Sequence, residues 1–372
     1  MDRDMDTPIE EQPVVEADFE ASRQLAHHYK SRPIREVLQE LTDATDPDLV
    51  PGHYGEGEVV DRLEKRIATL LGKEAAVFMP SGTMAQQIAL RIWCDRAGTN
   101  HVAFHPLCHL EIHEQGGYQR LHGLRSTLLG TADRMFTLDD LGELIEPVGA
   151  ILFELPQREI GGQLPTWDDL TAMVGWARER GIATHMDGAR LWESKPFYGR
   201  DYSEIAALFD SVYVSFYKIL GGIAGAALAG PADLIKEARL WQRRHGGNLV
   251  HLYPMTLSAE LGLDQRLDRV NDYYHKALEV AAVLSSLPGV RVVPDPPHTN
   301  MMHVFLEGDQ QRLLAAAKQV AREHDVDLFS SLTETILPDI HRFELALGDA
   351  SLEFHADEVR TLFETLLEYA TE

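Results

Sequence analysis

Hydrophobic and polar positions alternate between helical and strand spacing along most of this 372-residue chain. Apolar residues recur every three to four positions between Val59 and Leu71, which predicts a helix that ends at Gly72. A short apolar run at 75–79 predicts a strand, and Ser81 then stands where an N-cap belongs, ahead of a second helical series. Further strands are expected at 102–104, 150–155, 182–186, 212–216 and 226–229.

This alternation predicts an open, mainly parallel α/β sheet, in which ligands bind beyond the carboxyl ends of the strands. After Tyr253 the pattern changes to a long helix at about 256–285, short strands and two further helices, which is typical of a smaller α+β domain. Acidic residues dominate the start of the chain and predict disorder there. We therefore expect a disordered tail at 1–20, an N-terminal segment at 21–50, a large domain at 51–255 and a small C-terminal domain at 256–372.

Charge and cysteine content exclude several classes of protein. Lys and Arg number 34 against 59 Asp and Glu, and the net charge of −25 disfavours binding to nucleic acid or anionic membranes. The two cysteines, Cys94 and Cys108, provide no disulfide framework and fit a reducing compartment. With no signal peptide and no long apolar run, we expect a cytoplasmic protein that binds neither nucleic acid nor membrane.

The first candidate site is Pro80-Ser81-Gly82-Thr83, where a strand gives way to a helix. Backbone N–H groups, a glycine and two hydroxyls at a helix N-terminus form an anion site that suits a phosphate group. An ordinary N-cap would explain the serine as well.

Two further predicted strands end in polar groups that an apolar core would not need. Asp187 follows one strand, and Arg190 lies three residues on; a carboxylate there suits a cationic ring nitrogen, although a surface Asp–Arg pair is the simpler explanation. Lys218 follows another strand and precedes glycines and an apolar stretch. A lysine in such surroundings is partly desolvated, which favours the neutral, nucleophilic amine over a snorkelling surface lysine.

A phosphate cradle, a carboxylate for a pyridine nitrogen and a buried lysine are together the parts that hold pyridoxal phosphate. Their order and the motifs PSGTMAQQ (80–87) and HMDGARLW (185–192) resemble the low-specificity threonine aldolases, within the β-eliminating lyase group of fold-type I pyridoxal-phosphate enzymes. The segment FYKILGG (216–222) is a looser match. The resemblance implies the fold-type I transferase-like architecture, with a mainly parallel large domain and a smaller α+β C-terminal domain.

The resemblance also implies a role for each matching residue. Lys218 would attach the cofactor through a Schiff base, Asp187 would hold the pyridine nitrogen, and His109 would stack on the ring and act as acid or base. The other cofactor-binding residues would be Ser81, Gly82 and Thr83 at the phosphate, with Glu154, Arg190 and Ser215. The substrate-binding residues would be His27, Gln157, Arg190 and Arg342.

The chain departs from the family in the part that binds the substrate. An Arg-Ser-Asp segment near the family's N-terminus is replaced by Ala26-His27-His28. After Glu154, an Asn-Thr-His-Asn run is replaced by Leu-Pro-Gln-Arg, so Gln157 occupies the histidine position and can position a hydroxyl without taking its proton. We expect an intact cofactor half and an altered substrate half, with specificity set around His27, His28, Gln157 and Arg158 unless these are plain surface residues.

The histidine loop also permits a metal interpretation. His109 and His113 have i, i+4 spacing, with Cys108, Glu111 and Glu114 nearby, as in helical zinc sites. The H-E-x-x-H order is missing, and 17 histidines make chance neighbours common, so we expect no metal.

The prediction is therefore a pyridoxal-phosphate-dependent lyase whose small-molecule substrate is an amino acid. It would cleave the Cα–Cβ bond of a β-hydroxy-α-amino acid to give glycine and an aldehyde, as an aldolase does. A β-eliminating lyase or an aminotransferase on the same cofactor is the alternative within enzymes, and a catalytically silent cofactor-binding protein is the alternative outside them. The resemblance further implies a homodimer or homotetramer.

Overall fold

The structure is a computed structural model that describes residues 21–29 and 32–371. The tail predicted at 1–20 lies outside these residues. The chain divides into two compact units. The first comprises Pro33–Glu159 and Leu164–Asp268, and the second comprises Ile160–Gln163, the chain from Arg269 onward and the described residues before Pro33.

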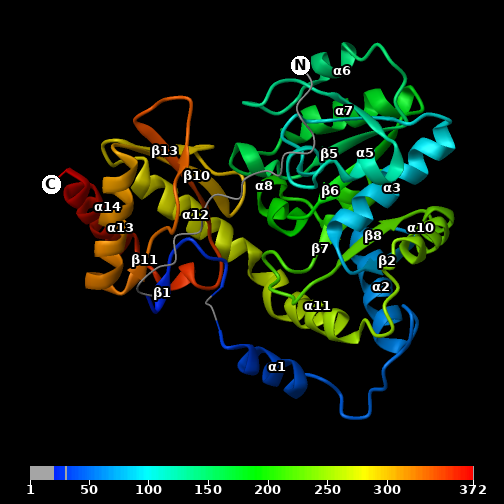
Figure 1. The fold of residues 1–372 in the computed structure, drawn as a ribbon, viewed down its shortest axis with the longest axis horizontal. Helices are drawn as coiled ribbons and strands as arrows, with labels where there is room; N and C mark the ends of the chain where they lie inside the picture. The colour runs from blue at the N-terminus through cyan, green and yellow to red at the C-terminus, as the bar shows by residue number, and fades with distance from the viewer. Residues whose placement is uncertain (1–20, 30–31, 372) are drawn as a thin grey trace. The chain divides into compact units, whose positions relative to one another are not determined.

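A seven-stranded sheet forms the centre of the first unit (Figure 1). Strand β8 runs antiparallel to both of its neighbours, whereas every other pairing in this sheet is parallel. The predicted open, mainly parallel α/β sheet is therefore confirmed. The strand order is β2 (Ala75–Met79), β8 (Ala226–Gly230), β7 (Ser211–Ser215), β6 (Ala183–Gly188), β5 (Ala150–Glu154), β3 (His101–Phe104) and β4 (Arg125–Leu128).

Helix α2 (Glu58–Leu71) ends where the sequence predicts, and helix α3 (Gly82–Ala97) begins where it predicts. The apolar stripe of α2 is buried, and the helix stops at Gly72 in the left-handed conformation (φ 61°). Ser81 caps α3 by accepting a hydrogen bond from the Met84 backbone N–H at 3.2 Å. Further helices of this unit are α1 (Ile34–Asp43), α4 (His109–Ile112), α5 (Gly117–His122), α6 (Leu138–Gly142), α7 (Trp167–Glu179), α8 (Lys195–Tyr198), α9 (Tyr202–Ala206), α10 (Ala232–Arg244) and α11 (Tyr253–Arg266).

The register of the sheet brings several strand ends to one edge. Glu154 at the end of β5 lies opposite Asp187 on β6. Met79 on β2 and Ser215 on β7 both pair with Ala226 of the antiparallel strand between them. The start of α3 therefore lies at the same edge as the carboxyl ends of β5, β6 and β7, where open α/β sheets bind ligands.

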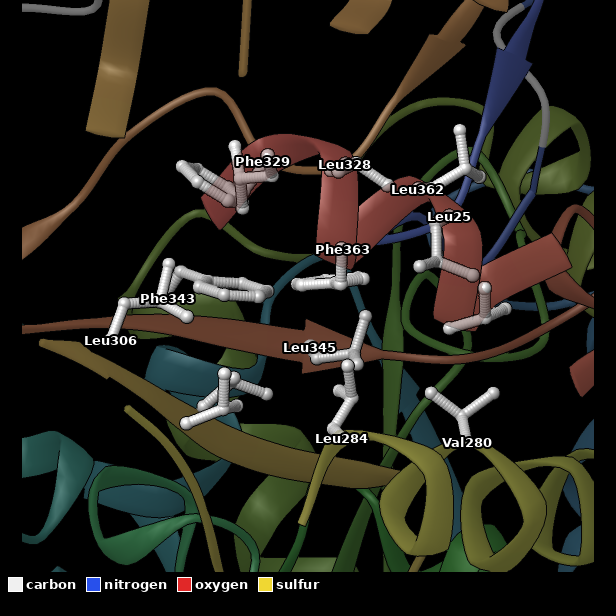
Figure 2. Packing of buried hydrophobic residues seen from close by; sticks show 14 of the residues in the cluster. Leu25, Val280, Leu284, Leu306, Leu328, Phe329, Phe343, Leu345, Leu362 and Phe363 are labelled. Carbon is white, nitrogen blue, oxygen red and sulfur yellow. The ribbon is translucent and has the colours of Figure 1, made fainter. Parts of the chain in front are cut away.

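The second unit is a smaller α+β body, as predicted. Its sheet is antiparallel throughout and has the order β12 (Thr333–Glu334), β13 (Ile340–Ala346), β10 (Met301–Glu307) and β9 (Val290–Val293). Figure 2 shows the aromatic centre of its core, where the Phe343 ring lies between the rings of Phe329 and Phe363 at centroid distances of 4.5 and 6.4 Å. The helices are α12 (Val270–Leu284), α13 (Gln310–His324) and α14 (Ala356–Thr371).

A short parallel pair joins the first described residues to this second unit. Strand β1 (Arg23–Gln24) pairs with β11 (Val326–Asp327). Leu25, the next residue, is fully buried in the core shown in Figure 2. The segment that precedes the large unit in sequence is therefore part of the small one.

The single long helix predicted at 256–285 is wrong. A 3-10 turn at Leu267–Arg269 separates α11 from α12, and the two helices belong to different units. The predicted domain boundary after residue 255 falls near the start of α11, which stays in the first unit through contacts such as the Arg62–Glu260 ion pair (2.7 Å). No helix among the described residues combines the length and hydropathy needed to cross a bilayer.

Candidate active site

The start of α3 offers the backbone N–H groups of Gly82 and Thr83, whereas the Met84 N–H is capped by Ser81. Ser81 and Thr83 are exposed, whereas Gly82 between them is buried. A Cβ on Gly82 would lie 2.0 Å from the hydroxyl oxygen of Tyr213, so no larger residue fits there. The first N–H groups of a helix have no intrahelical acceptor and attract anions. This part of the chain therefore fits a phosphate group.

A buried carboxylate pair lies at the same edge of the sheet. Asp187 is 3% exposed and accepts a hydrogen bond from the Ala189 backbone N–H at 3.0 Å. Burial raises the pKa of Asp187 to about 6, even though nearby His109 favours the charged form. Burial and the charge of Asp187 together raise the pKa of Glu154 to about 7. A cation beside these groups would stabilise their ionised forms, and the protonated ring nitrogen of pyridoxal phosphate is such a cation.

The Glu154 carboxylate also holds two loops in place through hydrogen bonds, one at His109 and one at Arg158. It accepts hydrogen bonds from the backbone N–H groups of His109 (3.2 Å) and Arg158 (3.1 Å) and from the Gln157 side-chain amide (3.1 Å). These contacts fix the position of the histidine loop relative to the end of β5. A contact between Glu154 and the cofactor stays a prediction.

His109 is the first residue of α4, and its imidazole is paired with a buried acid. Its Nδ1 lies 3.0 Å from Oε1 of Glu114, whose side chain is 2% exposed, whereas that of His109 is 42% exposed. Burial lowers the pKa of His109, but the Glu114 hydrogen bond and the charges of Asp187 and Glu154 outweigh this effect and raise the pKa above its ordinary value. The group is suited to proton transfer near neutral pH.

Lys218 lies just beyond the end of β7 and is half-buried. Its Nζ is 4.9 Å from the centroid of the Tyr217 ring, and the Tyr217 hydroxyl shares a hydrogen bond with Tyr213, the residue that covers Gly82. Two backbone hydrogen bonds hold the segment: the Gly221 N–H donates to the Lys218 carbonyl at 3.0 Å, and the Gly222 N–H donates to the Phe216 carbonyl at 2.7 Å. The predicted lysine and the predicted phosphate site are therefore connected through two tyrosines.

Ser215 and Arg190 lie in the same region. The Ser215 hydroxyl donates to the Ala189 carbonyl at 2.8 Å and thereby ties the end of β7 to the turn after β6. Arg190 is buried in that turn and acts electrostatically on both Asp187 and Tyr217. The Asp–Arg pair is thus not a surface pair.

The predicted substrate-binding residues are divided between the two units. Gln157 is 1% exposed, and its amide donates to the Leu107 carbonyl (3.0 Å) and to Glu154; its Oε1 has no hydrogen-bond partner among the described residues. His27 and Arg342 belong to the second unit, where the Arg342 guanidinium lies 3.1 Å from Nδ1 of His303. The roles of all three in substrate binding stay predictions.

Three residues of the site received no cofactor or substrate role from the sequence, where Glu114 entered only the metal interpretation. Glu114 and the tyrosines at 213 and 217 contact predicted site residues. The five-residue spacing from His109 to Glu114 is the only sequence signal, and it is uninformative without the fold. In the part of the chain that the structure describes, no cluster of His, Cys, Asp and Glu could hold a metal ion.

Known proteins resemble this chain over most of its length. The β-eliminating lyase family model matches residues 30–308. Low-specificity L-threonine aldolase 1 of Arabidopsis thaliana is 28% identical over 295 residues, 77% of this chain and 81% of that protein. The low specificity L-threonine aldolase of Escherichia coli K12 is 30% identical over 260 residues, 68% of this chain and 76% of that protein.

Solved structures are more similar still. A crystal structure of a putative L-allo-threonine aldolase from Listeria monocytogenes has a TM-score of 0.91 and 45% identity, and covers 94% of this chain and 97% of that chain. A putative aromatic amino acid β-eliminating lyase/threonine aldolase from Exiguobacterium has a TM-score of 0.90 and 41% identity, and covers 94% of this chain and 98% of that chain. A serine palmitoyltransferase from Sphingomonas wittichii, at 15% identity and a TM-score of 0.66, shares the fold alone.

Proposed function

This chain belongs to the β-eliminating lyase family, and we propose that it is a pyridoxal-phosphate-dependent lyase that splits a β-hydroxy-α-amino acid into glycine and an aldehyde. The relatives named as threonine aldolases support the reaction. The observation that carries the proposal is the buried Asp187 carboxylate at a strand end, in the same unit as the half-buried Lys218 and the start of α3.

Each part of this unit has a task that its geometry supports. Pyridoxal phosphate, when bound, supplies an electron sink for the electron pair released at Cα. Lys218 provides the amine that attaches it, and Asp187 holds the proton on its ring nitrogen. The backbone N–H groups at Ser81, Gly82 and Thr83, assisted by Ser215, bind its phosphate. The protonated ring nitrogen would then pair with the Asp187 carboxylate and offset the burial that disfavours its charged form.

Bond cleavage requires a base for the β-hydroxyl proton, and His109 is the candidate. Its pKa is raised because Glu114, Asp187 and Glu154 outweigh the effect of burial, which favours an imidazole that takes up a proton. Gln157 cannot accept a proton, but its Oε1 can accept a hydrogen bond and thereby orient the hydroxyl. Arg190 is proposed to bind the substrate carboxylate, and the same role for Arg342 and for His27 stays a prediction from the sequence.

The same proposal extends to assembly and location. Helix α1 has no buried residue, and Figure 1 shows it set apart from the sheet of its unit. Its Ile34 and Leu38 and the nearby Val50 are exposed apolar residues, which a second copy of the chain would cover in a homodimer or homotetramer. Cys94 and Cys108 are buried free thiols, which fits the cytoplasm.

The test is the visible spectrum and the products of the purified protein, loaded with pyridoxal phosphate and offered threonine, serine and phenylserine in turn. We expect a cofactor band that borohydride fixes to Lys218 and a release of glycine and aldehyde from at least one compound. Pyruvate or ammonia would instead indicate elimination, for which the replacement at Gln157 gives some support. A band that no amino acid changes would indicate a cofactor-binding protein without catalytic activity. The absence of any band would refute the proposal.

A further inference from the structure

The acid beside His109 is part of a longer chain of contacts. Glu114 Oε1 lies 3.0 Å from His109 Nδ1, and its other oxygen accepts a hydrogen bond from the Gln87 amide at 2.9 Å. Gln87 is fully buried on α3, the helix that begins at the proposed phosphate site. The Glu114 carboxylate is therefore held on both oxygens, by the Gln87 amide of α3 and by the His109 imidazole.

The backbone around Glu114 is shaped for this contact. The next two residues, Gln115 and Gly116, both have left-handed backbones (φ 52° and 64°), which is uncommon for glutamine and turns the chain at once into α5. Gly117 then leaves room for Gln87, because a Cβ there would lie 2.4 Å from the Gln87 amide nitrogen. A strained residue and a crowded glycine beside one carboxylate indicate that its position matters.

The surroundings of His109 assign its two ring nitrogens different tasks. The groups that face it are Glu114 on its own loop, Asp187 on β6, Glu154 on β5 and the His113 ring, 5.1 Å away between centroids. Glu114 is the acid hydrogen-bonded to its ring, and that bond is at Nδ1. When a carboxylate accepts from Nδ1–H, the neutral imidazole has its lone pair on Nε2.

We infer that Glu114 is a positioning residue that keeps a proton on Nδ1 of His109, so that Nε2 is the atom that exchanges protons with the substrate, and that Gln87 fixes the Glu114 carboxylate for this task. The inference rests on the proposed function, since His109 is the proton carrier only there. Nothing in it requires Glu114 to touch the substrate. It predicts that the charge and the shape of Glu114 act through the tautomer and titration of His109.

The first test uses the wild-type chain. Nitrogen-15 NMR of histidine-labelled protein, with and without pyridoxal phosphate, identifies His109 among the 17 histidines by comparison with a His109→Asn variant. We expect neutral His109 to carry its proton on Nδ1. A proton on Nε2 in the neutral form would overturn the inference, and this result does not depend on whether any substrate is turned over.

The second test compares Glu114→Gln with a matched control. His113 Nε2 lies 2.9 Å from Glu159, so Glu159→Gln removes the same kind of acid from the adjacent histidine. Glu114→Gln should lower the pKa of His109, reduce kcat about 10- to 100-fold and move the acidic limb of the kcat/KM profile to lower pH, with KM changed less than about threefold. Glu159→Gln should leave the titration of His109 as it is.

The outcomes separate the two proposals. An unchanged His109 titration in folded Glu114→Gln protein would overturn the role of Glu114, even if the wild type is an active lyase. A wild type that cleaves no amino acid would refute the proposed function. The NMR measurement would still show whether Glu114 keeps the proton on Nδ1 of His109. If Glu114→Gln does not fold, the wild-type tautomer decides.

Discussion

Replacement of Gly82 by alanine tests whether the site is built on close contact between α3 and β7. The added Cβ would lie 2.0 Å from the Tyr213 hydroxyl oxygen and 2.5 Å from its Cζ. Tyr213 cannot move away easily, because it is buried and its hydroxyl is hydrogen-bonded to Tyr217. Either the ring or the first turn of α3 must move. Such overpacking typically costs about 1–3 kcal/mol of the free energy of unfolding.

The magnitude translates into two measurements. In a unit of roughly 200 residues, each kcal/mol lowers the midpoint of thermal unfolding by about 2–4 °C. A displaced helix start also separates its N–H groups from the phosphate, and a loss of 1.4 kcal/mol there weakens cofactor affinity about tenfold. Calorimetry of the cofactor-free protein and titration with pyridoxal phosphate measure the two effects separately.

Gly175 provides the matched control, since it also lies in a helix but a Cβ there would meet nothing within 4 Å. Gly175→Ala should stabilise the protein by up to about 1 kcal/mol. Tyr213→Phe combined with Gly82→Ala should recover only part of the loss, because the ring carbon at 2.5 Å remains. If Gly82→Ala is as stable as Gly175→Ala and binds the cofactor like wild type, the close contact is not a constraint and the argument fails.

Three further changes have defined outcomes. Lys218→Ala should abolish cofactor attachment, and peptide mass spectrometry after borohydride reduction checks this; a reduced linkage at another lysine would contradict it. Burial raises the pKa of Glu154 from 4.5 to about 7, so its contribution is most favourable below pH 4.5 and is lost as the pH rises through 7. Urea titrations of the cofactor-free proteins measure this as the difference in free energy of unfolding between wild type and Glu154→Gln. That difference should fall by on the order of 3 kcal/mol between pH 4.5 and 7.5. Parallel pH curves for the two proteins would contradict the prediction. Phe363→Ala should destabilise the second unit by about 3–5 kcal/mol, whereas Leu337→Ala at an exposed position should change it by less than about 0.5 kcal/mol, and urea unfolding measures both.

Features that depend on a few neighbouring residues could be predicted from the sequence. The stripe of α2, its glycine stop and the Ser81 cap are local patterns, and the apolar runs mark the buried strands. The candidate cofactor-binding residues could be located at one sheet edge because they lie at or just beyond the ends of these strands, while their roles stay predictions. Strand β4 (RSTL) of the large sheet was missed, because it lies at the edge of the sheet, has exposed ends and shows no apolar run.

Features that depend on distant residues could not be predicted. The break at Leu267–Arg269 has no proline or glycine to mark it, and it reflects the division of the chain into two units. The pairing of Glu114 with His109 requires a left-handed turn at Gln115, a residue type that rarely adopts one. The contact of Gly82 with Tyr213 joins residues far apart in the chain, and no periodicity encodes it.

The pairing of β1 with β11 constrains the order in which the chain can fold as it leaves the ribosome. Residues 23–24 emerge before the large unit does, but their partners at 326–327 emerge after it. Until then Leu25 has no core to enter, because that core consists mainly of residues after Arg269. The chain passes between the units at 32/33, 159/160, 163/164 and 268/269, so neither unit can be released by a single cut. Co-translational folding of the large unit can therefore proceed before residues 23–25 meet their partners after Arg269.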